Sequence, residues 1–488
     1  MKRYVIEITV FLCGALGMIL ELVAARVLSP YVGSSNLIWT TIIGVMLTSM
    51  SIGYWIGGKL ADKDSNRNRL SSLILLGAIF TSLIPIGEVL LVKNFVAISQ
   101  NLAIVAFASA AIVFGVPSFV LATVSPYAVK LKDKQLEKEN IGGISGKISS
   151  LSTIGSIFGT FIAGFVLIPM FGIRSIILGI TFLLLMLSLI LYEHKTKKYY
   201  TMMFVLVVSL VMFNVLGKIL FIKNNPDIIQ DVDSEYSRIW VKKVEGKDIS
   251  YKTLQVETGL ESYINEQTKQ MGSKYLYYYD LFDYFQKDAK HTLLIGGAAY
   301  TYPTHYLEKY EDKTMDVSEI DSKMTKLAIE QFNLDITNPR LKVYHQDGRS
   351  FLNYTKNKYD CILIDAFKGV NAPFELTTYE AMQNAKKLLN KNGIVITNII
   401  SAIEGRESDF IQYEYATYQS VFDEVKLYQV ASNHEDTQKQ NLILVGIKGE
   451  NNINYEKQEE YKQLLETEIK EFSSNKKIVT DYYAPIGN

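Results

Sequence analysis

Nearly all the long apolar runs of this 488-residue chain lie before Lys223. A helix needs roughly 20 apolar residues to cross the hydrocarbon core of a bilayer. About seven runs meet this requirement, at approximately 4–28, 38–58, 70–92, 102–128, 148–170, 173–192 and 200–222. Residues 1–225 are therefore predicted to form a multi-pass α-helical membrane domain. Because the chain also exceeds what one core usually holds, a second unit is expected after it.

Positive charges between the apolar runs predict the orientation of this domain. They gather at the N-terminus and in alternate loops, as Lys2, Arg3, Lys59, Lys63, Arg67, Arg69, Lys130, Lys132, Lys134, Lys138, Lys147, Lys195, Lys197 and Lys198. The other loops hold chiefly Lys93 and Arg174. Since cytoplasmic loops carry the excess of cations, the N-terminus is predicted to be cytoplasmic. No small-residue cleavage site ends the first run, which favours a retained helix over a cleaved signal peptide.

An odd number of spans places the two ends of the bundle on opposite sides of the membrane. With a cytoplasmic N-terminus, the remainder of the chain would then face outward. A re-entrant segment or a miscounted span would reverse that result. The fourth run is the most irregular, because it contains Pro117 and Pro126. The sequence leaves the side of the second unit open.

Two kinds of residue inside the apolar runs bear on packing and function. The pairs Gly53/Gly57 and Gly155/Gly159 put small residues on one helix face, which lets neighbouring helices approach closely. Glu21 lies well inside the first run, where a carboxylate is costly. It is either a functional group or one satisfied by a neighbouring helix or a proton. Residues 58–63 (GKLADK) partly resemble a cytoplasmic loop motif of major facilitator transporters.

The hydrophobic pattern of the chain changes after Pro226. Short alternating runs over residues 226–270 predict a small antiparallel β region. Strand-like runs at 291–295, 314–318, 341–345, 360–365 and 393–399 then alternate with helical runs at 301–311, 321–333, 348–356 and 377–390. This alternation predicts an α/β Rossmann-like domain over 271–450 with a parallel sheet. Residues 451–488 read as a polar helix, at about 455–473, and a flexible end.

Charge and composition exclude two classes of function. The formal net charge of zero gives no sign of a nucleic-acid partner. Two cysteines and five scattered histidines do not make a metal site, so no metal is expected.

Small and acidic residues follow the predicted strands. Gly296 and Gly297 come after the first strand, Glu319 after the second, Asp347 and Gly348 after the third, and Asp365 after the fourth. Ligands of such sheets bind at the carboxyl ends of the strands. A glycine turn admits a ligand to a helix N-terminus, and a carboxylate can accept both ribose hydroxyls. Acids in register on successive strands therefore predict an adenosine site.

These stretches resemble the spermidine synthases, within the wider class of S-adenosylmethionine-dependent methyltransferase folds. The similarity is greatest to membrane-fused spermidine synthase-like proteins and runs from residues 21–26 (ELVAAR) to 393–396 (GIVI). Its most specific stretches are residues 234–239, 296–300, 319–321, 345–349, 359–365 and 373–378. The resemblance implies that Glu319 holds the ribose, Asp347 the adenine, and Asp365 the attacking amine as general base. Tyr278 resembles a family tyrosine that positions the amine.

The amine end of the pattern departs from the soluble synthases. Ala299 and Lys368 stand where those enzymes carry aspartates, and Glu261 stands where they carry a glutamine. Glu261 and Asp280 are the acids that can compensate. The adenosine half of the site is thus kept, while the amine half is altered.

The predicted function is that of an aminopropyltransferase-like enzyme. The resemblance implies S-adenosylmethionine or its decarboxylated form as co-substrate, no prosthetic group, and an amine such as putrescine as acceptor. Displacement within one sulfonium molecule, a methyltransferase, and a non-catalytic sensor or transporter of polyamines or nucleosides remain alternatives. A lipid bilayer is the expected surrounding of the first domain. Soluble relatives commonly associate, which leaves a homo-oligomer open.

Overall fold

The computed structural model describes residues 4–33, 35–99, 101–135, 141–193, 197–246, 249–366, 373–431, 434–450, 452–483 and 485. It divides into two compact units, Met1–Trp240 and Val241–Asn488. The division falls within strand β2 (Arg238–Glu245), later than the predicted boundary at 225/226. Each unit has its own hydrophobic core, and each is described by itself below.

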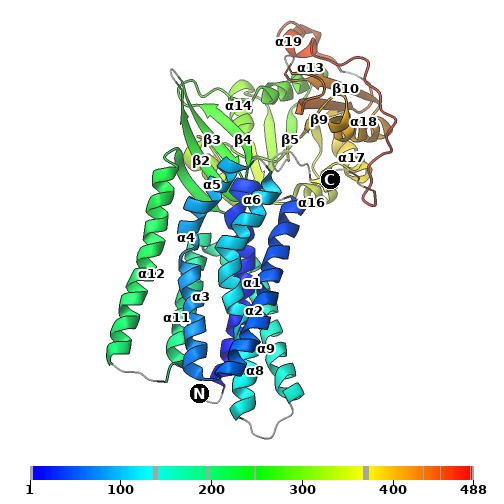
Figure 1. Cartoon of the computed structure of the whole chain (residues 1–488). Helices are drawn as coiled ribbons and strands as arrows, with labels where there is room; N and C mark the ends of the chain where they lie inside the picture. Colours follow the sequence, from blue (N-terminus) through cyan, green and yellow to red (C-terminus); the bar gives the residue numbers. More distant parts are fainter. Residues whose placement is uncertain are drawn as a thin grey trace. The chain divides into compact units, whose positions relative to one another are not determined.

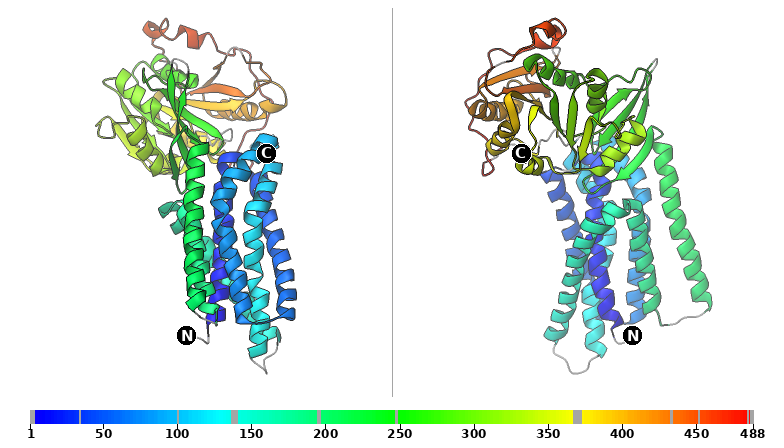
Figure 2. Two further views of the ribbon diagram at one scale, coloured as in Figure 1. Left: turned by 60° about the vertical axis from the view of Figure 1, so that its left-hand side comes forward. Right: turned by 180° about the vertical axis from the view of Figure 1, so that it is seen from behind.

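Among its described residues, the first unit contains seven helices that are long and apolar enough to cross a membrane. They run side by side, with α12 at the edge of the bundle (Figure 1; Figure 2). Their elements are α1 (Val5–Val32), α2 (Asn36–Lys63), α3 (Arg67–Ser82), α4 (Ile84–Gly87), η1 (Glu88–Val92), α5 (Lys93–Ile98), α6 (Leu102–Ser109), η2 (Ala110–Gly115), α7 (Val116–Ala122), α8 (Val124–Gln135), α9 (Ile141–Ile162), η3 (Ala163–Leu167), α10 (Ile168–Met170), α11 (Ile173–Leu191) and α12 (Lys197–Asn224). The predicted number of apolar helices is confirmed.

The fourth of these helices, Leu102–Lys134, is interrupted as its prolines predict. A π-helical turn, η2, precedes α7, and Pro117 lies in the first turn of α7. Proline is tolerated there because its missing N–H has no partner in a first turn. Helix starts elsewhere follow local capping. The Asn66 side chain accepts from Arg69 N at 2.8 Å, and the Asn101 side chain accepts from Ala103 N at 3.0 Å.

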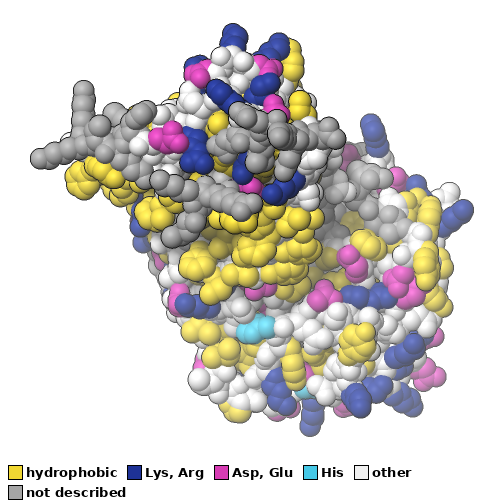
Figure 3. All heavy atoms as spheres, turned by 90° about the horizontal axis from the view of Figure 1, so that it is seen from below, with side chains coloured by type: hydrophobic (Ala, Val, Ile, Leu, Met, Phe, Trp, Pro, Cys, Tyr) yellow, Lys and Arg dark blue, Asp and Glu magenta, His cyan; other side chains and the backbone are white. Residues whose placement is uncertain are grey.

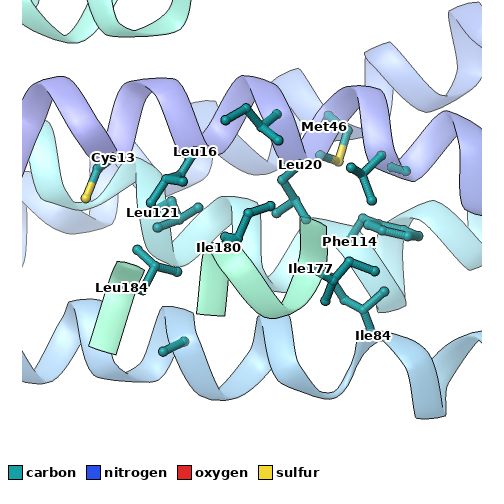
Figure 4. Packing of buried hydrophobic residues seen from close by; sticks show 14 of the residues in the cluster. Cys13, Leu16, Leu20, Met46, Ile84, Phe114, Leu121, Ile177, Ile180 and Leu184 are labelled. Carbon is teal, nitrogen blue, oxygen red and sulfur yellow. The ribbon is translucent and has the colours of Figure 1, made fainter. Parts of the chain in front are cut away.

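The bundle core is apolar and closely packed. Leu16 and Leu20 of α1 lie among Leu121 of α7 and Ile177 and Ile180 of α11 (Figure 4). At Gly155 and Gly159 of α9, an added Cβ would lie 2.0 Å from Phe11 O and 2.3 Å from Ala15 O of α1. The close approach of these two helices therefore depends on glycine, as the small-residue spacing predicts.

The outward faces of the helices are apolar as well. Hydrophobic side chains form a continuous yellow area in Figure 3. On the helices, Phe158, Phe161, Phe165, Phe182 and Phe204 are each at least 52% exposed. Apolar surface of this extent is far more than a helix in water leaves uncovered.

A buried ionic cluster fixes where the chain leaves the bundle. Arg238 donates to Glu88 Oε1 at 2.8 Å and to both carboxylate oxygens of Asp231, at 2.9 and 2.8 Å. Asp233 accepts from Ile173 N, at the start of α11, at 2.8 Å. Strand β1 (Ile228–Asp233) and the start of β2 are thereby held to the bundle end at which α12 finishes. Pairing of this kind is what makes a buried arginine tolerable.

The second unit contains a hairpin and a seven-stranded sheet. The hairpin pairs β3 (Ser250–Val256) with β4 (Gly259–Asn265), within the predicted β region. The sheet has the order β10-β11-β9-β8-β5-β6-β7. Its strands are β5 (His291–Ile295), β6 (Thr314–Ser318), β7 (Leu341–Tyr344), β8 (Tyr359–Ile364), β9 (Leu389–Ser401), β10 (Glu424–Gln429) and β11 (Gln440–Ile447). The five strands from β5 to β9 are parallel, as predicted.

Two features of this unit correct the sequence prediction. Strands β10 and β11 are antiparallel, so the sheet is mixed. The predicted helix at 455–473 is wrong, because that segment holds only η7 (Tyr455–Lys457) and α19 (Lys462–Leu465). The other helical elements are η4 (Lys274–Leu281), α13 (Phe282–Phe285), α14 (Thr301–Lys309), α15 (Ser322–Gln331), α16 (Gly348–Tyr354), η5 (Phe374–Leu376), α17 (Tyr379–Leu388), η6 (Arg406–Ser408) and α18 (Asp409–Val421).

Both faces of the sheet are covered. Leu294 and Leu363 belong to one core cluster, while Leu293 and Ile362 belong to another. Neighbouring residues of a strand point to opposite faces. The two clusters are therefore the two faces, which explains why these strands are apolar throughout.

Candidate functional site

The candidate site lies where the strand order of the sheet reverses. From β5 the chain moves outward through β6 to β7, then crosses to β8 on the other side of β5. The carboxyl ends of β5 and β8 meet directly: Asp365 N donates to Ile295 O at 2.8 Å. Such a reversal is where open α/β sheets bind ligands. Gly296 and Asp365, which follow these two strands, are therefore brought together.

The turn after β5 requires glycine and left-handed backbone. Gly296 has φ +92°, and an added Cβ would lie 2.2 Å from Asp365 O. Ala298 and Tyr300 have φ of 45° and 55°, which is uncommon for residues with side chains. Strain of this kind persists only where the surrounding contacts impose it.

Glu319, after β6, imposes that turn. Its Oε2 accepts from Gly297 N at 2.8 Å and from Ala298 N at 3.1 Å, and its Oε1 accepts from Asp321 N at 2.8 Å. Burial raises the pKa of the Glu319 carboxyl, and the three backbone donors oppose that rise. A carboxylate has about four acceptor positions, so about one is left for a ligand hydroxyl.

Asp347 and Gly348 start α16 after β7. Asp347 is exposed and caps the helix, accepting from Ser350 N at 2.8 Å. At Gly348 an added Cβ would lie 2.4 Å from Ile295 Cγ2, so glycine lets the start of α16 approach β5. Both residues therefore lie at the same edge of the sheet as Gly296.

Asp365 is the only one of these acids that is both partly exposed and raised to a pKa near neutrality. Its Oδ2 accepts from the Tyr275 hydroxyl at 3.1 Å, and its Oδ1 accepts from Asn398 Nδ2 at 3.2 Å. Burial raises the pKa of Asp365 to about 6, although Asn398, Tyr275 and Tyr279 lower it. Near neutral pH this carboxyl is thus ionised and still basic enough to accept a proton.

Tyr275 and Asn398 were missed by the sequence analysis. Asn398 lies in β9 inside an apolar run, and Asn441 Nδ2 donates to its Oδ1 at 2.9 Å. A polar residue in a buried strand is a signal that sequence reading can use. Tyr275 lies three residues before Tyr278, the tyrosine that the sequence analysis singled out, and its spacing alone does not distinguish it.

Two predicted site residues lie elsewhere. The Tyr278 hydroxyl donates to Gln429 O at 3.2 Å and lies 3.0 Å from the Thr467 hydroxyl, so it does not reach Asp365. Asp280 accepts from Tyr302, His305 and Lys309, at 3.1, 3.0 and 2.9 Å. Although burial acts to raise it, His305 and Lys309 hold the pKa of Asp280 below its ordinary value. Both side chains belong to η4, and these contacts are with residues other than Asp365.

Comparison with known proteins identifies the second unit. Residues 281–445 match the family model of the spermine/spermidine synthase domain. The chain carries a spermidine synthase-like domain.

Relatives of the domain are named for aminopropyl transfer. A polyamine aminopropyltransferase of Vibrio vulnificus is 30% identical over 149 residues, which are 30% of this chain and 48% of the relative. Polyamine aminopropyltransferase 2 of Aquifex aeolicus is 23% identical over 425 residues, covering 82% of this chain and 80% of the relative. A solved probable spermidine synthase from Corynebacterium glutamicum has a TM-score of 0.39 at 21% identity, covering 45% of this chain and 80% of that one. This chain spans half or less of the length of several curated relatives, so the activity of the whole protein is a proposal.

Of the positions at which the chain departs from the soluble synthases, Glu261 and Ala299 lie within the described residues. Burial, then Asp365, and to a lesser extent Glu261 of β4 raise the pKa of Tyr275. Ala299 is fully buried and offers no polar group. Lys368 lies outside the described residues. Within the described ranges, no group of three or more His, Cys, Asp or Glu side chains is arranged to hold a metal ion.

Proposed function

We propose that the synthase domain transfers the aminopropyl group of decarboxylated S-adenosylmethionine to an amine such as putrescine. The observation that carries the proposal is Asp365, a basic carboxylate at the strand-order reversal of a spermidine synthase-like domain. The relatives named polyamine aminopropyltransferase support the same class of reaction.

The nucleoside end of the substrate would be held by the turn after β5 and its neighbours. Glu319 keeps about one acceptor position for a ribose hydroxyl, and Gly296 and Gly297 allow the ligand to approach the backbone. Asp347 would accept from the adenine amino group. Together these residues would place the sulfonium beside Asp365, since all of them follow parallel strands at one edge of the sheet.

Asp365 would act on the amine. An alkylammonium has an ordinary pKa of about 10 and must lose a proton before its nitrogen can attack. Removal of surrounding water lowers that pKa, and the Asp365 carboxylate then takes the proton. The freed nitrogen attacks the carbon next to the sulfonium and forms an N–C bond. The C–S bond breaks, its electron pair stays on sulfur, and methylthioadenosine leaves.

Tyr275 and Asn398 would hold Asp365 in place, and Glu261 would attract the rest of the amine. The Tyr275 hydroxyl and the Asn398 amide donate to different oxygens of Asp365, which fixes the plane of the carboxylate. Glu261 would supply a second negative charge, which acts on Tyr275 as that of Asp365 does. In this proposal Glu261 supplies the negative charge that the soluble synthases have from an aspartate at the position of Ala299.

The Asp365→Asn variant tests this proposal. We expect turnover with decarboxylated S-adenosylmethionine and putrescine to fall by about 10² to 10⁴, because the variant removes the base. Binding of labelled methylthioadenosine, measured by equilibrium dialysis, should stay close to that of the unmodified chain. The matched control is Asp312→Asn, an exposed carboxylate before β6, at the opposite edge of the sheet. Full activity of Asp365→Asn would rule out the proposed base.

We further propose that the seven apolar helices cross a lipid bilayer with the N-terminus in the cytoplasm. Their length and apolar outward faces support the first part, and the cations of alternate loops support the second.

A further inference from the structure

A pocket with polar walls lies inside the apolar bundle. It is formed between α1, α2, α7, α8 and α9. Its polar lining consists of Tyr54, Ser118, Ser125, Ser152 and Ser156. So many hydroxyl groups around one space in a bundle of this kind mark a candidate binding site.

Two hydroxyl groups of this pocket, those of Ser118 and Ser156, donate to groups of the helices. Ser156 Oγ donates to Ser152 O at 3.0 Å and lies 3.3 Å from Gly14 O, and Ser118 Oγ donates to Met46 Sδ at 3.6 Å. A hydroxyl has one proton to donate and two lone pairs. With those two protons committed to the helices, the Ser118 and Ser156 oxygens keep lone pairs that can accept from a ligand. The wall therefore suits a ligand rich in N–H donors.

A carboxylate lies on the same face of α1 as the pocket lining. Val10, Gly14 and Gly17 line the pocket, and Glu21 follows Gly17 by four residues, one turn along the same face. Side chains of a helix lean toward its N-terminus, so Glu21 leans over Gly17. An added Cβ at Gly17 would meet no atom within 4 Å, which shows that the space there is open.

One oxygen of the Glu21 carboxyl is left unsatisfied among the described residues. Its Oε2 is shielded from solvent and has no hydrogen-bond partner there. The other charged residues of α1 act at its two ends. Glu7 pairs with Lys132 at 2.8 Å and with Lys147 at 3.6 Å, and Arg26 donates to Glu235 O. A shielded carboxylate beside an open space with acceptor oxygens would be stabilised by a bound cation.

We propose that this pocket binds a small aliphatic ammonium. Glu21 would supply the opposite charge, the serine oxygens would accept from the ammonium N–H groups, and the Tyr54 ring would face the cation. The site is separate from Asp365 and is built entirely from the first unit. The choice of a diamine as the probe rests on the proposed function of the synthase domain.

The test counts the amine sites of the full chain in detergent by equilibrium dialysis against labelled putrescine. We expect two sites in the unmodified chain, one in Glu21→Gln, one in Asp365→Asn and none in the double variant. A Glu21→Gln chain that keeps the full number of sites would overturn the proposal. If Glu21→Gln loses a site and Asp365→Asn loses none, the bundle site stands and the acceptor site of the proposed function is wrong.

A second variant blocks the pocket without removing the charge. Gly17→Leu puts a side chain into the open space and should lose the same site as Glu21→Gln. Its control is Gly179→Leu on α11, where an added Cβ also meets no atom within 4 Å and which lines no part of the pocket. Retention of both sites in Gly17→Leu would contradict the proposal, as would loss of one in Gly179→Leu.

Discussion

At the scale of single residues, the proposed chemistry depends on the pKa of Asp365. Burial raises that pKa to about 6, while Asn398, Tyr275 and Tyr279 lower it. The base works only when it is ionised. Activity should therefore be full above this pKa and should be lost as the pH falls through about 6.

The Tyr275→Phe variant should shift the pH at which activity is lost on the acid side. Because Tyr275 donates to the carboxylate, its removal raises the pKa of Asp365. A hydrogen bond to a charged group is worth about 1.5–3 kcal/mol, so the midpoint of the pH–rate profile should rise by about one to two units. Tyr278→Phe is the matched control and should leave the midpoint unchanged, because its hydroxyl contacts Gln429 and Thr467. A shift in Tyr278→Phe alone would restore the sequence prediction.

Site acids that follow strands could be predicted from the sequence, because strand ends are marked by local pattern. The positions of Glu319, Asp347 and Asp365 follow from the strands, although their roles remain proposals. The sequence could not show which tyrosine contacts Asp365. Tyr275, Tyr278 and Tyr279 share one 3-10 helix, η4, in which side chains three residues apart lie on the same side, so spacing does not separate Tyr275 from Tyr278. Only tertiary packing decides which of them reaches Asp365.

At the scale of elements, the first four parallel strands were predicted to within one residue at each end, while β9 (Leu389–Ser401) is longer than the predicted 393–399. Strands β10 and β11 were not predicted, because an antiparallel edge pair lacks the alternation with helices that marks the core of the sheet. The polar segment at 455–473 has helical composition, yet it packs by short turns around Tyr461, which is buried. Helix propensity was overridden there by tertiary contacts.

The close packing of α1 and α9 makes a prediction at this scale. Gly159→Ala puts a Cβ 2.3 Å from Ala15 O, and relieving such a clash costs about 1–3 kcal/mol. We expect the thermal unfolding midpoint of the detergent-solubilised chain to fall by several degrees. Gly164→Ala is the control, since its Cβ meets no atom within 4 Å. Equal midpoints for the two variants would show that the approach of these helices does not depend on Gly159.

At the scale of the whole molecule, the odd number of apolar helices puts the two ends of the bundle's chain on opposite sides of a membrane. The first helix begins near the N-terminus, and the seventh ends at Asn224, at the opposite end. With a cytoplasmic N-terminus, Lys223 should then be reached from outside the cell and Lys134 should not. We expect an impermeant maleimide to label Lys223→Cys and to leave Lys134→Cys unlabelled on intact cells. Both native cysteines are buried and give a low background. The reverse pattern would place the N-terminus outside.

The central claim is the transfer of an aminopropyl group, and the identity of the released nucleoside tests it most directly. The full chain, purified in detergent, is given decarboxylated S-adenosylmethionine with and without putrescine, or S-adenosylmethionine, and products are read by mass spectrometry. We predict methylthioadenosine and spermidine, formed only when putrescine is present. Methylthioadenosine without putrescine would indicate displacement within one sulfonium molecule. S-adenosylhomocysteine from S-adenosylmethionine, or no product despite nucleoside binding, would contradict the account.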